Sequence, residues 1–394
     1  MKVVVAHNRY RSAQPSGENR VVDAEIAQLT AAGVEVLPLL RSSDEIGSLP
    51  VRDRVLLPLS PLWNAGTQRA LAELLRRHRP DVLHLHNPYP LLSPAVVRTA
   101  HRYGVPVVHT AHNYRQVCPN GIYFRDGRIC HDCRGRRLAL PAVIHRCYRG
   151  SAAQSAVMAV TLAAHRGTWR SVDRFLAPTA AIAAHLRGYG IPDERIVVKP
   201  NALPDPGPPS PPPPDGDLLF LGRLSAEKGL ELLLDAWTRH REGTLGRLRI
   251  AGDGPLRPLV ERVARARTDV TYAGRLDPTE TRAALAASAA VVVPSTCEDV
   301  LPTVVIEALA AGRPVLGTAR GGIPYLVGDA GWVVEPTVAA VAAALPVVRA
   351  EAASRSAAAR TRYESTFHPD VVTRQLLEVY ESVRRAPGVE RRRA

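Results

Sequence analysis

Residues 294–314, PSTCEDVLPTVVIEALAAGRP, decide the fold. An apolar run at 290–293 precedes them and has the length of a buried strand. Pro302 suits the first position of a helix, and Gly312 followed by Pro314 is typical of a helix end. The stretch therefore predicts a strand, a short acidic loop and a helix, in that order.

Similar units are repeated on both sides of this stretch. In the first half we expect strands at 3–6, 34–39, 82–86, 105–109, 172–177 and 195–198, and helices at 18–32, 66–77, 94–103 and 180–186. In the second half we expect strands at 218–221, 248–251, 270–272, 290–293 and 315–317, and helices at 229–238, 257–265, 278–287 and 302–311. Short apolar strands that alternate with amphipathic helices indicate parallel sheets covered on both faces.

A proline-rich run at 203–216 interrupts the pattern, because proline fixes φ and removes backbone donors. It predicts a stiff linker, with a PxxP ligand for a recognition module as the alternative. The chain is therefore expected to be an α/β protein with two doubly wound domains that face a cleft. The expected boundaries are a first domain at 1–203, a linker at 204–216, a second domain at 217–367, a helix at 368–385 that packs back on the first domain, and a disordered basic tail at 386–394.

The composition indicates a packed protein of two or three domains rather than a disordered chain. Of 394 residues, 46% are hydrophobic and 22% are charged, which is ordinary for globular proteins. The formal net charge is +14, but an aromatic content of 5% offers no stacking platform, so nucleic acid is not an expected partner. No secretory leader pattern follows Met1, and the weakly polar stretch 152–164 is too short to span a bilayer, so we expect a cytoplasmic protein.

The acidic loop and the helix after it predict a ligand site. In an open parallel sheet, ligands bind beyond the carboxyl ends of the strands, where helix N-termini present N–H groups to anions. A phosphate could therefore bind near Thr303. Asp299 and Glu307 flank this position, and carboxylates accept hydrogen bonds from hydroxyls. An anionic centre with hydroxyl-rich ends describes a sugar nucleotide.

A second loop, LGRLSAEKG at 221–229, also follows an expected strand and opens a helix. Arg223 and Lys228 could together neutralise a diphosphate, the arginine through its planar fork and the lysine as a point charge. Only three of the 51 basic residues are lysines (Lys2, Lys199 and Lys228), which favours a function for Lys228. The alternative is a solvated charged loop.

Four cysteines, Cys118, Cys130, Cys133 and Cys147, lie in one segment of the first half. One C-x2-C pair among four thiols is consistent with a structural zinc site. Free thiols and a disulfide remain open alternatives.

Arginines are concentrated in the same region of the chain. The cluster predicts attraction to an anionic membrane surface or to a lipid diphosphate acceptor, and a solvated arginine-rich face is the alternative. Its members are Arg134, Arg136, Arg137, Arg146, Arg149, Arg166, Arg170 and Arg174.

Several segments share their order and spacing with a known family. They are GRLSAEKG at 222–229, AGDGPL at 251–256, YAGR at 272–275 and EALAAGRPV at 307–315, with PSGE at 15–18, VLHLHN at 82–87 and HTAHNYR at 109–115 in the first half. The chain resembles the family 4 retaining glycosyltransferases, which have the GT-B fold of two Rossmann-like domains. The resemblance covers nearly the whole chain.

The resemblance implies roles for the matching residues. Arg223 and Lys228 would hold the diphosphate and stabilise the leaving group in place of a divalent metal. Glu307 would bind the ribose, and Asp299 would contact the donor sugar, with Glu298 as the alternative. The family usually has glutamate at the position of Asp299.

Further roles follow from the same resemblance. Gly274 and Arg275 would lie beside the base, Gly17 would let the first loop approach the transferred sugar, and His112 would contact that sugar near the reacting centre. Ser16 stands where the family has glycine. The implied catalytic set is His112, Asp299, Arg223 and Lys228, and the implied donor-binding set is Gly17, Arg223, Lys228, Gly274, Arg275, Glu298, Asp299, Leu301, Thr303, Val304 and Glu307.

The predicted protein is a retaining glycosyltransferase that needs no catalytic metal. It would move a sugar from a UDP-sugar or GDP-sugar, bound by the second domain, to a glycan, lipid-linked or small-molecule acceptor, bound by the first domain, in polysaccharide biosynthesis. Peripheral contact with the inner face of the plasma membrane is expected. The alternatives are a non-catalytic nucleotide-sugar-binding protein and a sugar-nucleotide epimerase of the same architecture.

Overall fold

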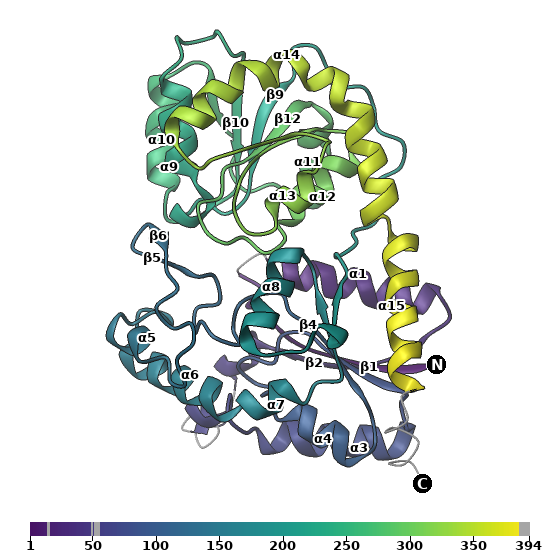
Figure 1. Cartoon of the computed structure of the whole chain (residues 1–394). Helices are drawn as coiled ribbons and strands as arrows, with labels where there is room; N and C mark the ends of the chain where they lie inside the picture. The colour runs from purple at the N-terminus through teal and green to yellow at the C-terminus, as the bar shows by residue number, and fades with distance from the viewer. Residues whose placement is uncertain (14–15, 49, 51–55, 386–394) are drawn as a thin grey trace. The chain divides into compact units, whose positions relative to one another are not determined.

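The computed structural model describes residues 1–13, 16–48, 50 and 56–385. The chain divides into two compact units, and Figure 1 labels their helices and strands. The first unit contains 1–123, 131–202 and the chain from 372, and the second contains 124–130 and 203–371. The predicted disordered tail at 386–394 and Pro15 of the PSGE segment lie outside the described residues.

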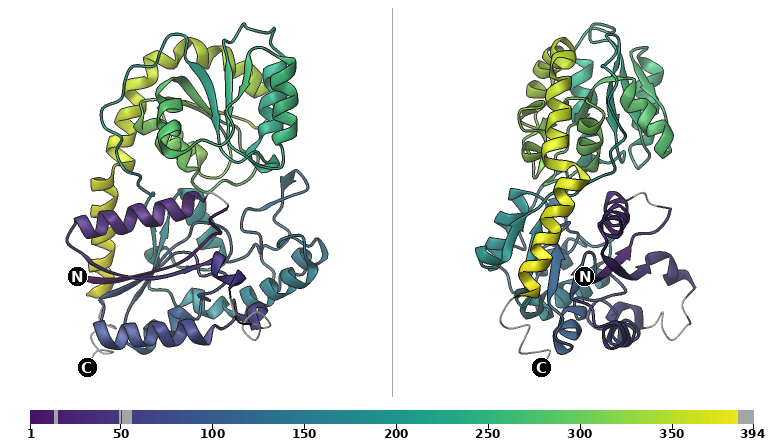
Figure 2. Two further views of the ribbon diagram at one scale, coloured as in Figure 1. Left: turned by 180° about the vertical axis from the view of Figure 1, so that it is seen from behind. Right: turned by 90° about the vertical axis from the view of Figure 1, so that its right-hand side faces the viewer.

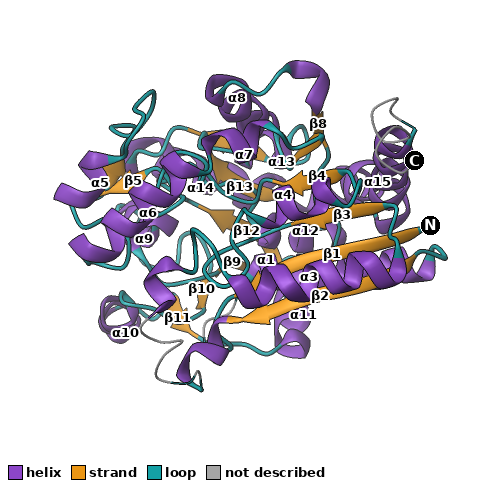
Figure 3. Cartoon of the chain, turned by 90° about the horizontal axis from the view of Figure 1, so that it is seen from below, coloured by secondary structure: helices purple, strands orange, loops and turns teal. Residues whose placement is uncertain are grey.

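The first unit is built on a six-stranded parallel sheet with the order β2-β1-β3-β4-β7-β8. Its strands are β1 (Lys2–Arg9), β2 (Glu35–Ser42), β3 (Val82–Leu85), β4 (Val107–Thr110), β7 (Arg174–Ala177) and β8 (Ile196–Val198), and its connecting helices are α1 (Gly17–Ala31), α3 (Ala65–His78), α4 (Val96–Arg102) and α8 (Ala180–Tyr189). Every strand and helix predicted for this half is present. Figure 3 shows β2, β1 and β3 side by side.

The C-terminal helix α15 (Pro369–Arg384) packs on the sheet of the first unit. Leu376, Val379 and Tyr380 recur at helical spacing on one face, and they join the same apolar core as Val3 and Val5 of β1. Burying an aliphatic side chain of this kind stabilises a fold by about 1.5–3 kcal/mol. Helix α15 is therefore part of the core of the first unit.

A long insertion separates β4 from β7. It contains a small hairpin of β5 (Phe124–Arg125) and β6 (Arg128–Ile129), followed by α5 (Leu140–Ile144), α6 (Ala152–Ala164) and α7 (Arg166–Arg170). The hairpin residues 124–130 cluster with the second unit, although they lie inside the stretch predicted as the first domain. Within the described residues, no helix has both the length and the apolarity needed to cross a membrane.

The second unit has its own six-stranded parallel sheet, with the order β11-β10-β9-β12-β13-β14. Its strands are β9 (Asp217–Leu221), β10 (Leu248–Ala251), β11 (Val270–Tyr272), β12 (Ser288–Val293), β13 (Val315–Thr318) and β14 (Trp332–Val334). Its helices are α9 (Leu230–Thr238), α10 (Arg257–Ala266), α11 (Pro278–Ala286), α12 (Thr303–Ala310), α13 (Ile323–Val327) and α14 (Val338–Arg362).

Sequence analysis did not predict β14, α13 or α14. Helix α14, seen from two further sides in Figure 2, is 25 residues long and rich in alanine, and it contains Pro346. Alanine gives little contrast between a buried and an exposed face, and an internal proline normally argues against a helix. Packing supplies the missing signal, because Val341, Leu345 and Val348 join the core of the second unit.

The proline-rich run from 203 to 216 contains no helix or strand, and it belongs to the second unit. Arginines of that unit hold its backbone and side chains. Arg313 donates to the Ser210 carbonyl at 2.8 Å, Arg349 donates to the Pro214 carbonyl at 3.0 Å, and Arg360 pairs with Asp205 at 2.7 Å. The segment is thus docked along the second unit and is not a free spacer.

Candidate functional site

Two loops of the second unit meet at the carboxyl edge of its sheet. Strands β9 and β12 are parallel neighbours, so the loops that follow them leave the sheet at the same edge. The Thr296 N–H donates to the Glu227 carbonyl at 3.0 Å, which joins the two loops. Gly229 has a φ of +70°, and a Cβ there would lie 1.8 Å from the Pro294 carbonyl oxygen. Only glycine permits this close approach.

The joined loops bring Lys228 and Asp299 into direct contact. The Lys228 ammonium lies 2.6 Å from the Asp299 carboxylate, which also accepts a hydrogen bond from the Ser295 hydroxyl at 3.0 Å. Burial disfavours the charged ammonium, but the attraction of Asp299 outweighs burial and raises the pKa of Lys228 overall. Lys228 is therefore a fixed positive charge at neutral pH.

Arg223 supplies a second cation close to Lys228. Its guanidinium is 63% exposed and lies 2.9 Å from Glu227, which also accepts from the Ser225 hydroxyl at 2.7 Å. Repulsion from the Arg223 charge lowers the pKa of Lys228, against the larger influence of Asp299. The two cations are therefore close enough to act on one bound anion. An exposed arginine held by one carboxylate can turn toward a bound anion at little cost.

Glu298 and Asp299 point to different partners. The Glu298 carboxylate accepts from the Gly321 N–H at 3.2 Å, in the loop after β13, whereas Asp299 faces Lys228. Gly321 has a φ of +53°, and a Cβ on it would lie 2.2 Å from the Asp299 carbonyl oxygen. The acidic loop is therefore wedged between the loops that follow β9 and β13.

The remaining predicted donor residues follow strands of the same sheet. Thr303 is the first residue of α12, whose N-cap, Pro302, offers no side-chain acceptor to the first N–H groups. The half-buried residues Leu301, Val304 and Glu307 lie before and within this helix. The loop after β11 holds Gly274 and the exposed Arg275, and the Gly274 carbonyl accepts from the Gly252 N–H at 2.7 Å.

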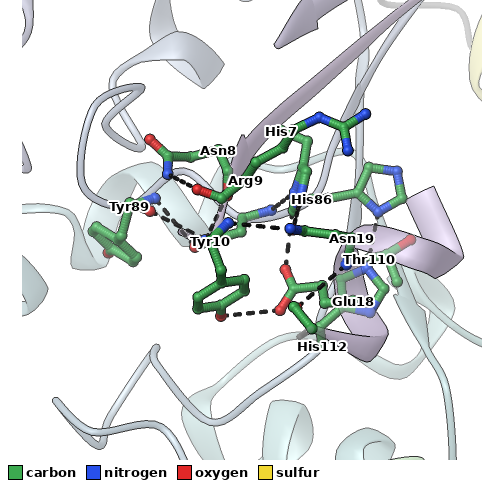
Figure 4. Close-up of polar contacts among 12 residues, drawn as sticks. His7, Asn8, Arg9, Tyr10, Glu18, Asn19, His86, Tyr89, Thr110 and His112 are labelled. Atoms are coloured by element: carbon green, nitrogen blue, oxygen red, sulfur yellow. Dashed lines mark hydrogen bonds and ion pairs between the residues drawn. The ribbon is translucent and has the colours of Figure 1, made fainter. Parts of the chain in front are cut away.

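Gly17 and His112 lie in the first unit and not at this edge. Gly17 is exposed at the start of α1, and the preceding Ser16 caps that helix by accepting from the Asn19 N–H. The serine that replaces the family's glycine thus has a structural role. His112 follows β4 and stacks on His86, which follows β3, with ring centroids 5.1 Å apart. Figure 4 shows His112 beside His86 and Glu18.

A buried polar network extends from His112 into the core of the first unit. His86 Nδ1 lies 2.8 Å from His112 Nε2, and His86 Nε2 lies 3.2 Å from a carboxylate oxygen of Glu25 on α1. The same carboxylate lies 3.0 Å from His84 and 3.4 Å from the Lys199 ammonium. One ring nitrogen of the His86–His112 pair donates to the other, in the direction that the two tautomers set, and the Glu25 carboxylate faces the far nitrogen of His86.

Sequence analysis did not select His86, Glu25 or Lys199 for this site. The available signal was Glu25 itself, which lies on the buried face of α1 with Val21, Val22 and Leu29. A carboxylate on an otherwise apolar helix face indicates a buried partner.

The surface above this network is a small pocket of the first unit, with an empty volume of about 250 Å³ that includes open solvent. Glu18, His86, His112 and Arg115 are among its lining residues. The Tyr10 hydroxyl donates to Glu18 at 3.1 Å and accepts from Arg115 at 3.5 Å. The pocket thus combines a neutral histidine, a carboxylate and a guanidinium, which can all bind hydroxyl groups.

Glu25, His84 and His86 are the one group in the described part of the chain that brings three metal-binding side chains within 4.8 Å of one another. The Lys199 ammonium already balances the Glu25 carboxylate. These residues therefore fit an internal ion pair better than a cation site.

The predicted zinc site gains no support from the structure. All five cysteines lie among the described residues, and none forms a disulfide. Cys118, Cys133 and Cys147 of the first unit do not form a close group of ligand atoms within the described chain. The Cys118 thiol donates to Asn120 at 3.0 Å, and Cys133 and Cys147 pack against a small apolar cluster that contains Ala139 and Ala142.

Lowering the pH from about 7 to about 4 is expected to destabilise the first unit. Burial lowers the pKa of His84 to about 4 and the pKa values of His109 and His185 to about 3. The unfolded-state pKa is about 6.5, so between these values the unfolded chain binds more protons than the folded chain. The stability is therefore fully present above about pH 6.5 and is lost as the pH falls toward 4. Urea midpoints measured across this range would test the expectation.

A matched control is His145→Gln, because His145 is exposed on the same unit. This variant should show the same loss of stability as the wild type. A urea midpoint that does not change between pH 7 and pH 4.5 would contradict the prediction.

Comparison with known proteins identifies relatives for both halves of the chain. Residues 15–205 match the family model described as Glycosyltransferase Family 4, and residues 215–348 match the model described as Glycosyl transferases group 1. Alpha-D-kanosaminyltransferase of Streptomyces kanamyceticus is 32% identical over 44% of this chain and 41% of that protein. The putative colanic acid biosynthesis glycosyltransferase WcaL of Escherichia coli K12 is 29% identical over 55% of this chain and 58% of that protein. The chain spans about half the length of these curated relatives.

Solved structures of low sequence identity share the fold. Anabaena Alr3699/HepE, solved in complex with UDP and glucose, matches with a TM-score of 0.64 and 16% identity over 97% of this chain and 100% of that chain. Sucrose-phosphate synthase from Thermosynechococcus elongatus matches with a TM-score of 0.69 and 18% identity over 97% of this chain and 98% of that chain. Together with the two parallel sheets, these matches show the GT-B architecture of two Rossmann-like domains.

Proposed function

Because this chain belongs to the family 4 glycosyltransferases, and its second half matches the group 1 glycosyltransferase domain, we propose that it transfers a sugar from a nucleoside-diphosphate sugar to an acceptor hydroxyl, with retention of the anomeric configuration. The second unit binds the donor, and the first unit binds the acceptor. The observation that carries the proposal is the Lys228–Asp299 contact beside Arg223 at the carboxyl edge of the second sheet.

The charges of this edge suit a sugar diphosphate. We assign Lys228 and Arg223 as the cations that bind the two phosphates. The uncapped N–H groups at the start of α12, near Thr303, would donate hydrogen bonds to the same diphosphate. When Lys228 pairs with a bound diphosphate instead of Asp299, the Asp299 carboxylate becomes available to accept hydrogen bonds from sugar hydroxyls. Glu307 on α12 is the proposed partner of the ribose.

Leaving-group stabilisation is the main chemical task in this proposal. Breaking the anomeric C–O bond of the donor leaves negative charge on the diphosphate and positive charge on the sugar. Fixed cations stabilise this separation, and each well-placed group is worth roughly 3–4 kcal/mol. The acceptor oxygen then bonds to the anomeric carbon, and its proton passes to the departing diphosphate. The two cations do the work that a divalent metal would otherwise do.

His112 has the role of a neutral hydrogen-bonding group toward the transferred sugar. Burial holds its pKa well below the usual range. Its Nε2 is engaged by His86 Nδ1 at 2.8 Å, and Nδ1 is the ring nitrogen that we assign to a hydroxyl of the sugar.

The donor and acceptor classes follow from relatives. Alr3699/HepE was solved with UDP and with UDP-glucose, so UDP-sugars are the first donors to test, followed by GDP-sugars. WcaL is named for colanic acid biosynthesis, and we propose a glycan or lipid-linked acceptor for this chain. The arginines of the first unit are the proposed contact with an anionic membrane surface.

The test is a transfer reaction with purified protein, a panel of UDP- and GDP-sugars and a lipid extract, in buffer that contains EDTA. We expect release of a nucleoside diphosphate and a glycosylated product, detected by mass spectrometry, with the donor's anomeric configuration kept in the NMR spectrum. The proposal fails if donors bind but no diphosphate is released with any acceptor or with water, which would indicate a binding protein. Isomerisation of the donor without transfer would instead indicate an epimerase.

A further inference from the structure

A second pocket of the first unit lies between the insertion after β4 and helix α8, and it is distinct from the His112 pocket. Its empty volume is about 530 Å³ with the part open to solvent included. We call it the arginine pocket, because its lining includes Arg134, Arg136, Arg137 and Arg166. Sequence analysis placed these four arginines in a longer cluster expected to attract an anionic membrane surface or a lipid diphosphate acceptor, and the structure gathers them around one cavity.

The four arginines have no carboxylate partner within the described residues, in contrast to arginines such as Arg360 and Arg267, which pair with aspartates. Two of them are held by aromatic rings instead. The Arg134 guanidinium lies 5.6 Å from the ring centre of Tyr123, and that of Arg166 lies 5.7 Å from the ring centre of Tyr189. Such contacts orient a guanidinium without neutralising it.

Four positive charges around one cavity repel one another, and an anion in the cavity would relieve this repulsion. Guanidinium groups bind phosphate oxygens through paired hydrogen bonds, which makes arginine the preferred partner of phosphate. The chemistry of the lining therefore indicates a phosphate or diphosphate ester rather than a neutral sugar.

Gln116 connects this pocket to the His112 pocket, because it lines both. Its side-chain oxygen lies 3.2 Å from His185 Nε2, and its side-chain nitrogen lies 3.4 Å from His109 Nε2. Gln116, which is 4% exposed, is therefore the wall that the two pockets of the first unit share.

We propose that the arginine pocket binds a phosphate or diphosphate group of the acceptor. This inference rests on the proposed function, since it names the acceptor class of a transferase. The phosphate ester can be soluble or attached to a lipid. The lipid source has a structural feature in its favour, because the apolar side chains of Leu140 and Ile144 on the adjacent α5 are 54% and 75% exposed.

The experiment measures binding of inorganic pyrophosphate to the full chain by calorimetry. Wild type should bind it at two sites, one in each unit. The double variant Arg134→Gln/Arg137→Gln should lose the first site, with affinity there weakened about 10- to 100-fold, and should bind UDP as wild type does. The matched control is Arg146→Gln/Arg149→Gln, two exposed arginines of the same insertion that do not line the pocket. This control should bind pyrophosphate as wild type does.

A second double variant, Arg223→Gln/Lys228→Met, separates this inference from the proposed function. It should lose UDP and the second pyrophosphate site and keep the first. If this variant binds UDP as wild type does, the proposed donor site is refuted, but the proposal for the arginine pocket is not affected. If Arg134→Gln/Arg137→Gln binds pyrophosphate at both sites as wild type does, the arginine pocket is refuted while the donor site stands. The urea midpoint of each variant is measured as well, to check that the variant remains folded.

Vesicles distinguish the two sources of phosphate. Phosphatidylcholine vesicles with and without phosphatidic acid are sedimented with the protein. If the phosphate belongs to a lipid, the protein should bind only the vesicles that contain phosphatidic acid, and pyrophosphate should release it from them. Both Arg134→Gln/Arg137→Gln and Leu140→Ser/Ile144→Ser should lose this vesicle binding. A soluble ester predicts pyrophosphate binding without vesicle binding. If Arg134→Gln/Arg137→Gln binds phosphatidic acid vesicles as tightly as wild type does, the proposal that the phosphate belongs to a lipid is wrong.

Discussion

Replacing Lys228 with methionine is expected to lower kcat for sugar transfer by about 10²–10³-fold, because one fixed charge that stabilises the leaving diphosphate is lost. Methionine keeps most of the length and apolar volume of the lysine stem. The Michaelis constant for the donor should change much less than kcat, because the charge on the diphosphate grows as the C–O bond breaks. Steady-state kinetics with a UDP-sugar would provide both constants.

The matched control is Lys2→Met, which removes one of the three lysines from an exposed pair with Glu35. Its kcat should stay within about twofold of wild type, because a surface ion pair contributes little. Lys228→Met also leaves the Asp299 carboxylate without its partner, so the urea midpoint must be measured as well. A folded Lys228→Met variant with a kcat near that of wild type would show that Lys228 only anchors the acidic loop.

Replacing Glu25 with glutamine is expected to lower the free energy of unfolding of the first unit by about 3–5 kcal/mol, the usual cost of breaking a buried ion pair by removing one partner. Burial opposes the Glu25 charge, but His84, Lys199 and His86 together hold its pKa well below the usual range. The carboxylate is therefore charged at neutral pH. Glutamine has nearly the same shape as glutamate, but it leaves the Lys199 ammonium, whose side chain is 1% exposed, without a counter-charge.

Urea unfolding of three variants tests this cost. Glu73→Gln, which breaks an exposed pair with Arg76, should change stability by less than about 1 kcal/mol. The double variant Glu25→Gln/Lys199→Met should recover most of the loss, because it removes the unpaired charge as well. If Glu25→Gln costs no more than Glu73→Gln, the network does not stabilise the unit through its charges.

The same variant reports on His112. We propose Glu25 as a positioning residue, because its carboxylate lies 3.2 Å from His86 Nε2 and His86 contacts His112. The ring-nitrogen NMR signals of His86 and His112 should therefore shift in Glu25→Gln. Unchanged signals would mean that stacking alone orients the two rings.

Local patterns predicted most of the elements that build both sheets. The apolar runs of β9 and β12, the proline and glycine that bound α12, and the spacing of Leu376 and Tyr380 on α15 are all readable within one turn or one strand of the chain. Arg223, Lys228 and the acidic loop could be selected for the same reason, because each follows directly on a predicted strand. Helix α14 could not, since its alanines mark no buried face.

What the amino-acid sequence alone determined was the α/β alternation and the loops that carry charge, because hydrophobic period and turn residues act over a few positions. Only the tertiary structure decided which charges meet. Lys228 contacts Asp299, which lies 71 positions away in the sequence, and Lys199 contacts Glu25, which lies 174 positions away. A buried charge needs a partner, because an unpaired charge is costly to bury. The local sequence does not show which distant segment supplies that partner, because only the packing of the whole chain brings the two segments together.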